Sequence, residues 1–132
     1  TVSWMVRRMA HENSMHRWDA ENAVGVATLF DGDLARDAVD EVLDVAWQYG
    51  MRGPVSGYPT STLHLHRTDG EGEWMLSSVD DQLVVGHEHA KGDVAARGTA
   101  SDLALLVWGR RRPTVEVFGD EAVLDAWLAL TP

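Results

Sequence analysis

The hydrophobic positions follow a helical period at the start of the chain. Residues 2–22 contain no Gly or Pro, and their apolar side chains recur at intervals of three and four residues, as in an amphipathic helix. Apolar residues occupy two adjacent faces of this segment, so we expect the helix to be packed on more than one side. A second helical segment covers residues 34–49, with Asp33 as its N-cap and Gly50 as its C-terminal stop.

The period becomes alternating from residue 60 onward. His64 and His66 share one face of a predicted strand, and Leu63 and Leu65 share the other. The turn residues that follow favour an antiparallel meander, with further strands at residues 73–79 and 82–87 and a short strand at 93–97.

A third helix is predicted at residues 100–109, with Ser101 as its cap. It is apolar nearly all round, so we expect it to be deeply buried. A strand at residues 114–118 and a final helix that Asp120 caps complete the chain. This order indicates an α+β fold in which one long helix precedes a domain with a mainly antiparallel sheet and about three helices.

Composition narrows the classes of function. A formal net charge of -10 argues against a nucleic-acid partner. No segment approaches the roughly 20 apolar residues that cross a bilayer, so we expect no membrane partner. The absence of Cys excludes a disulfide or a thiolate nucleophile and fits a cytoplasmic protein. Because the chain starts at Thr1 and enters a helix almost at once, we expect a fragment or a processed product of a longer protein.

Glu12 and His16 form the first candidate metal site. Residues four apart lie on one helix face, and a carboxylate with an imidazole suits zinc and similar divalent metals. His11 is five residues from His16 and diverges from it by roughly 140° around the helix, so it is expected to face elsewhere. The alternative is a polar pair on a solvated face. A catalytic zinc normally takes three protein ligands, so the third must come from another element or another chain.

Two further histidine pairs, His64 with His66 and His87 with His89, are spaced to share a strand face. Such pairs either ligate a metal, even completing a site with Glu12 and His16, or are half-exposed strand residues.

Three arginines, Arg110, Arg111 and Arg112, follow the predicted buried helix. Cations at a helix C-terminus are stabilised by the helix dipole, which is an adequate structural role for one or two of them. An arginine fixed there could also clamp a carboxylate substrate through two parallel hydrogen bonds.

Several motifs, taken together and in order, resemble one family across nearly the whole chain. They include Arg7-Arg8-Met9-Ala10-His11-Glu12, Leu63-His64-Leu65-His66, Gly72-Glu73-Trp74, Ala100-Ser101-Asp102-Leu103 and Trp108-Gly109-Arg110. The ordered set resembles the actinobacterial mycothiol-dependent maleylpyruvate isomerase family.

The resemblance implies two domains. Residues 1–24 would be the last helix of an incomplete DinB-like four-helix bundle, and residues 25–132 a C-terminal domain similar to sterol carrier proteins. Glu12 and His16 match the family's Glu-x-x-x-His metal ligands, whereas the family's third ligand, a histidine from an earlier helix, has no counterpart here. Arg110 is the best match for the family's substrate-facing arginine, although the alignment could equally favour Arg111 or Arg112.

Two functions follow from this reading. The first is the C-terminal part of a thiol-dependent isomerase or transferase that uses a divalent metal, such as zinc, and mycothiol on a small substrate such as a carboxylate. Whether this chain alone is an enzyme stays open, because part of the metal site is missing from it. The second is a non-catalytic, sterol-carrier-like module that binds a small ligand or dimerises. Two chains could also pair through their first helices.

Overall fold

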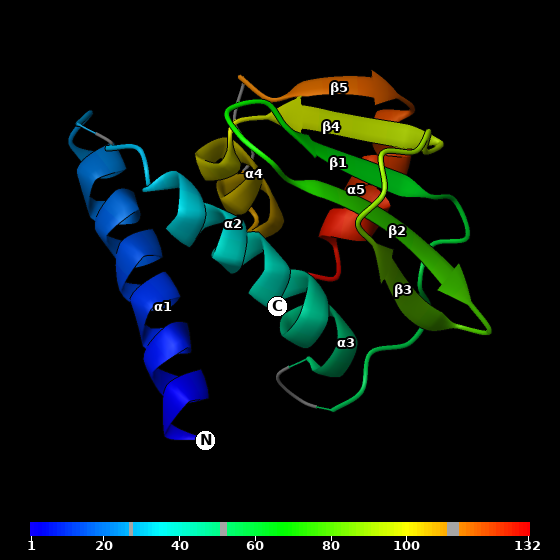
Figure 1. Cartoon of the computed structure of the whole chain (residues 1–132), viewed down its shortest axis with the longest axis horizontal. Helices are drawn as coiled ribbons and strands as arrows, with labels where there is room; N and C mark the ends of the chain where they lie inside the picture. Colours follow the sequence, from blue (N-terminus) through cyan, green and yellow to red (C-terminus); the bar gives the residue numbers. More distant parts are fainter. Residues whose placement is uncertain (27, 51–52, 111–113) are drawn as a thin grey trace.

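One long helix stands beside a five-stranded sheet that carries helices on one face (Figure 1). The computed structural model describes residues 1–26, 28–50, 53–110 and 114–132. In chain order its elements are α1 (Val2–Ala23), α2 (Gly32–Glu41), the π-helical η1 (Val42–Ala46), α3 (Trp47–Tyr49), β1 (Leu63–Arg67), β2 (Glu73–Val79), β3 (Gln82–Gly86), β4 (Val94–Gly98), α4 (Ala100–Val107), β5 (Glu116–Gly119) and α5 (Glu121–Leu128). The predicted α+β class and the long first helix are confirmed.

The sheet has the strand order β3-β2-β1-β4-β5. The predicted meander is confirmed, because β1 pairs antiparallel with β2 and β2 pairs antiparallel with β3. The pairing of β4 with β1 is parallel, whereas β5 pairs antiparallel with β4. Figure 1 shows α4 and α5 behind the sheet, and the segment between β3 and β4 crossing in front of it.

The core lies between the sheet and these helices. Leu63, Leu65, Trp74 and Leu76 are buried on the sheet face that α4 and α5 cover. Every residue of α4 is buried, as its apolar sequence predicts. Its partners include α2, so α4 is enclosed by the sheet and a second helix.

Two predicted caps are wrong, because the side chains that accept the first backbone N–H groups lie earlier in the chain. Asp31, not Asp33, accepts hydrogen bonds from the backbone of Asp33 and Leu34 at the start of α2. Thr99, not Ser101, caps α4, and the Ser101 hydroxyl instead accepts the backbone N–H of Phe30. The cap by Asp120 is confirmed.

The predicted helix over residues 34–49 is not one uniform α-helix. It changes to π-helical hydrogen bonding at η1 before it resumes as α3. The predicted stop is confirmed, since Gly50 has a φ of 61°, a conformation that glycine adopts without steric cost.

Helix α1 docks on α2 through charged side chains. Arg7 donates a 2.8 Å hydrogen bond to Asp37, which holds the pKa of that carboxyl below its usual range. Arg8 donates at 2.9 Å to the fully buried Glu41, whose other oxygen lies 2.8 Å from Nδ1 of the buried His11. A buried carboxylate is stable only when paired in this way.

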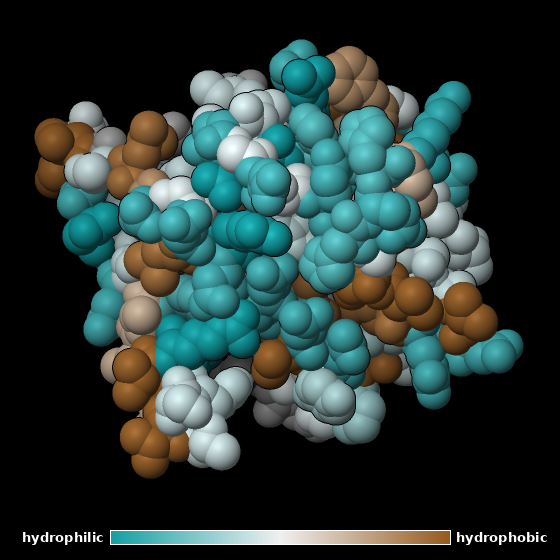
Figure 2. All heavy atoms as spheres, viewed as in Figure 1, coloured by the Kyte–Doolittle hydropathy of each residue, from teal (hydrophilic) through white to brown (hydrophobic). Residues whose placement is uncertain are grey.

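The opposite face of α1 is exposed, so within this chain the helix packs on one side and the prediction of two packed faces is not met. Met15 and Trp18 join the core, whereas the exposed apolar residues of the opposite side are Val2, Met5, Val6 and Met9. Trp4, on the docked face near the N-terminus, is also exposed. Figure 2 shows hydrophobic side chains along this edge of the molecule. Among the described residues, no helix has the length and hydropathy needed to cross a bilayer.

Replacing Glu41 with Gln should lower the free energy of unfolding by about 2 kcal/mol, because Arg8 and His11 would lose their buried anionic partner. Urea denaturation would measure the change, and amide exchange would locate it in α1. Glu116→Gln, an exposed change on β5, is the matched control. A Glu41→Gln effect within about 0.5 kcal/mol of zero would contradict the role assigned to this carboxylate.

Candidate functional site

The two predicted metal ligands lie together on α1, and Glu12 also lines a cavity between α1 and the rest of the chain. His16 Nε2 is 3.3 Å from Glu12 Oε2, and His16 Nδ1 is 3.6 Å from Asp19 Oδ2. The side chain of Glu12 is 29% exposed and that of His16 is 68% exposed. The pair therefore sits at the surface, with His16 open to ligands from outside.

Arg110 reaches this group from the end of α4. Gly109 has a φ of 83°, and the backbone N–H of Arg110 donates to the Leu105 carbonyl at 2.7 Å, which turns the chain towards α1. The guanidinium donates two 2.6 Å hydrogen bonds to the two oxygens of Asp19 and a third, at 2.8 Å, to the Trp108 carbonyl. Arg111 and Arg112 lie outside the described residues.

The Arg110–Asp19 pair alters both groups electrostatically. The hydrogen bond from Arg110 lowers the pKa of the Asp19 carboxyl, and His16 adds a smaller effect in the same direction. The same hydrogen bond raises the pKa of Arg110. Both groups are therefore charged at neutral pH, and Asp19 connects the predicted metal ligands to the predicted substrate arginine.

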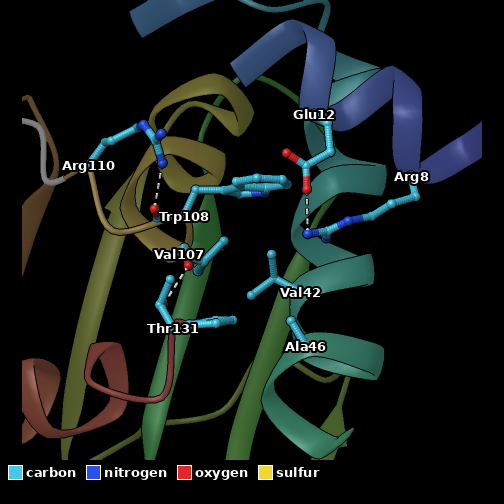
Figure 3. Close-up of a pocket in the computed structure, with 9 residues that line it drawn as sticks. Arg8, Glu12, Val42, Ala46, Val107, Trp108, Arg110 and Thr131 are labelled. Atoms are coloured by element: carbon cyan, nitrogen blue, oxygen red, sulfur yellow. Dashed lines mark hydrogen bonds and ion pairs between the residues drawn. The ribbon is translucent and has the colours of Figure 1, made fainter. Parts of the chain in front are cut away.

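A cavity of about 350 Å³ opens beside this group. Its charged lining residues are Glu12, Arg8 and Arg110, and its apolar wall includes Val107 and Trp108. Figure 3 shows Glu12 and Arg8 on one side of the space and Trp108 and Val107 facing them. This combination of apolar walls and a few convergent polar groups is typical of a small-ligand site.

Arg8 is a cavity residue that the sequence prediction missed. Its Nη2 lies 2.6 Å from Glu12 Oε1, and its guanidinium carbon lies 5.0 Å from the centre of the Trp108 ring. The spacing of four residues from Glu12 was a usable signal for the ion pair. The contact with Trp108 depends on tertiary packing and left no local signal.

His11 faces away from the Glu12–His16 pair, as its spacing predicts. Its Nδ1 hydrogen-bonds to Glu41, and its Nε2 is 2.9 Å from Asp37 Oδ2, within ion-pair distance but without hydrogen-bond geometry.

A second polar cluster occupies the outer face of the sheet. His64 Nε2 and His66 Nδ1 each lie 2.6 Å from an oxygen of Glu73, and His89 Nδ1 lies 3.1 Å from Glu73 Oε1. The predicted His64–His66 pair is present, but His89 joins it without His87, whose ring meets the Glu73 backbone carbonyl. Among the described residues, no cluster of three or more His, Asp or Glu side chains placed to hold one metal ion includes Glu12 or His16.

Glu73 is held as an anion in this cluster. Burial raises the pKa of its carboxyl, but hydrogen bonds from His64, His89 and His66 together outweigh burial and lower it. Because a carboxylate can only accept, each of the three ring nitrogens acts as a donor to it.

The comparisons with known proteins identify a family and a fold. The family model of the MDMPI C-terminal domain, named for mycothiol-dependent maleylpyruvate isomerase, matches residues 33–126. A solved structure titled "UbiJ-SCP2 Ubiquinone synthesis protein" aligns with 79% of this chain and 93% of its own, at 20% identity and a TM-score of 0.53. The inverting sec-alkylsulfatase Pisa1 from Pseudomonas sp. aligns with 77% of this chain and 16% of its own, at 19% identity and a TM-score of 0.50.

A third solved structure, sterol carrier protein domain 2 of Helicoverpa armigera, aligns with 91% of this chain and 83% of its own, at 13% identity and a TM-score of 0.43. The search of curated proteins gives no match. The sterol-carrier-like fold expected from the sequence is therefore confirmed by the first structural neighbour.

Replacing Arg110 with Ala should raise the pKa of Asp19 towards its ordinary value of about 3.9, because the double hydrogen bond is lost. A depressed carboxyl pKa stabilises the folded state above pH about 4, and this contribution disappears as pH falls through the folded-state pKa. Both side chains are partly exposed, so the loss of stability at pH 7 should stay under about 1 kcal/mol.

A carbon-detected NMR titration of the Asp19 carboxyl would measure the shift. Arg17→Ala is the matched control, since Arg17 lies near Glu21 and should leave the pKa of Asp19 unchanged. An unchanged Asp19 pKa in the Arg110 variant would show that the pair does not hold in solution.

Proposed function

The chain belongs to the MDMPI C-terminal domain family, and from that membership we propose that it is the C-terminal part of a mycothiol-dependent enzyme that uses a divalent metal, acting as a thiol-dependent isomerase or transferase. The observation that carries the proposal is the junction at Asp19. There His16, one of the two proposed metal ligands of α1, lies 3.6 Å from the carboxylate that also binds the proposed substrate arginine from the end of α4.

The separation of Glu12 and His16 fits two ligands of one zinc ion. Donor atoms at 2.0–2.1 Å from a tetrahedral zinc lie roughly 3.3 Å apart, and Glu12 Oε2 and His16 Nε2 are 3.3 Å apart. A third ligand would come from a helix packed on the exposed apolar face of α1, with residues 1–24 as the last helix of a DinB-like bundle and residues 25–132 as the C-terminal domain. When bound, the metal would lower the pKa of the mycothiol thiol.

Arg110 would bind and orient the carboxylate of the substrate. Its planar guanidinium makes the paired hydrogen bonds that a carboxylate requires, as it does with Asp19. A substrate carboxylate would therefore exchange with Asp19. Val107 and Trp108 exclude water from the neighbouring cavity wall, which strengthens the attraction between unlike charges there.

A second function is supported by the same cavity. Its apolar wall, formed by Val42, Ala46, Val107 and Trp108, suits a small apolar ligand without chemistry. This is the non-catalytic binding module, in which Arg8 and Arg110 would serve as structural ion pairs.

The kinetic test uses the full-length protein, as it is expressed naturally, in an assay that contains zinc, mycothiol and maleylpyruvate. His16→Ala should abolish thiol-dependent turnover because a metal ligand is lost. Arg110→Lys should raise KM for the carboxylate substrate about tenfold or more, because one hydrogen bond of the guanidinium fork is lost. Arg17→Lys, which changes an exposed arginine on the same helix, should leave both kcat and KM unchanged.

Equal turnover by the His16 and Arg110 variants and the unaltered protein would refute the assigned roles. Absence of thiol-dependent turnover, together with binding of a fluorescent fatty acid that Trp108→Ala weakens, would favour the non-catalytic module.

A further inference from the structure

We propose that His64, His66, Glu73 and His89 bind one divalent transition-metal ion on the outer face of the sheet. This site is separate from Glu12 and His16, and its ligands all come from the described part of the chain. The proposal does not depend on the proposed enzyme function.

The sheet register places three of the four ligands. His66 on β1 lies directly opposite Glu73 on β2, and His64 shares the same face of β1 because side chains two apart in a strand point the same way. The burial pattern agrees, since the alternate residues Leu63 and Leu65 face the core.

The fourth ligand is held by the segment that crosses in front of the sheet between β3 and β4. Asp93 accepts hydrogen bonds from the backbone and hydroxyl of Thr62, and the Thr62 hydroxyl accepts the Asp93 N–H. At Gly92 a Cβ atom would lie 2.9 Å from the backbone nitrogen of His64, so only glycine permits this close approach. These contacts fix the segment on β1 and bring His89 over the other ligands.

The rings have the spacing that a shared ion requires. Imidazoles bound through nitrogen to one tetrahedral zinc have ring centres roughly 5 Å apart. The ring centres of His64 and His89 are 5.3 Å apart, those of His66 and His89 are 5.5 Å apart, and those of His64 and His66 are 6.1 Å apart. One donor atom from each of the four residues lies within 4.8 Å of every other.

The donor set selects the class of metal. Three imidazoles and one carboxylate favour zinc and neighbouring transition metals over magnesium or calcium, which prefer oxygen ligands. Four protein ligands occupy all four positions of a tetrahedral ion, which is the arrangement of a structural rather than a catalytic zinc. The net charge of -10 also attracts cations to the protein.

An ion there would join β1 and β2 to the crossing segment. A cavity of about 530 Å³ beside His64 and His89 gives an ion access to the ligands. In Figure 2 hydrophilic side chains cover the centre of the face on which this segment lies. Metal binding should therefore stabilise the outer face and raise the melting temperature.

The test is titration of the chelator-stripped protein with Co²⁺ and Zn²⁺. We expect one tightly bound ion per chain at this cluster, because Glu12 and His16 alone supply too few ligands to compete with it, together with a tetrahedral Co²⁺ absorption spectrum and a raised Tm. His89→Ala and Glu73→Gln should each weaken binding by at least about tenfold, since even loss of an outer-shell partner costs that much. His89 is 74% exposed at its side chain, so its replacement should not disturb folding.

Two controls assign the ion to this cluster. His87→Ala removes a nearby exposed histidine that is not in the set and should leave affinity unchanged. His16→Ala removes the proposed ligand on α1, and the ion at the sheet cluster should remain bound. Loss of the ion in His16→Ala but not in His89→Ala would overturn the proposal and place the metal on α1. The proposal is also refuted if the unaltered protein binds neither Co²⁺ nor Zn²⁺ at millimolar concentration.

Discussion

The orientation of α1 depends on one buried carboxylate. Glu41 is fully buried and needs both Arg8 and His11 as partners, which fixes the rotation of α1 against α2. Because side chains repeat around a helix every 3.6 residues, this rotation also decides where Glu12, His16 and Asp19 point. A buried ion pair contributes little net stability after desolvation, so its main effect here is on geometry.

Most elements of the fold could be predicted from the period of the apolar residues, because burial on one face leaves a local signal. The strand at β2 is an example. The cap at Asp120 was predictable from another local signal, the preference of Asp for helix N-caps. The cap at Ser101 is wrong because Thr99, two residues earlier, caps α4, and the Ser101 hydroxyl accepts a hydrogen bond from the backbone N–H of Phe30, a contact distant in sequence. The parallel pairing of β4 with β1 joins strands distant in sequence. The helical and alternating spacings of apolar residues identify the elements but do not specify which strands pair.

The two polar sites also combine contacts that leave a local sequence signal with contacts that depend on tertiary structure. The i,i+4 spacing predicts that Glu12 and His16 lie together, and pleating predicts that His64 and His66 do. The pairing of Arg110 with Asp19 spans 91 positions and depends on how α4 docks beside α1. Glu73 enters its cluster through strand register, which local patterns do not encode.

The Arg110–Asp19 pair has a consequence for selectivity. Asp19 is tethered beside the guanidinium, so it competes at an effective concentration of the millimolar order or higher. A carboxylate in solution that makes only the same two hydrogen bonds is at a disadvantage against this internal competitor. If Arg110 binds a substrate carboxylate as proposed, it would discriminate against common metabolic acids and favour a molecule with a second point of attachment nearby.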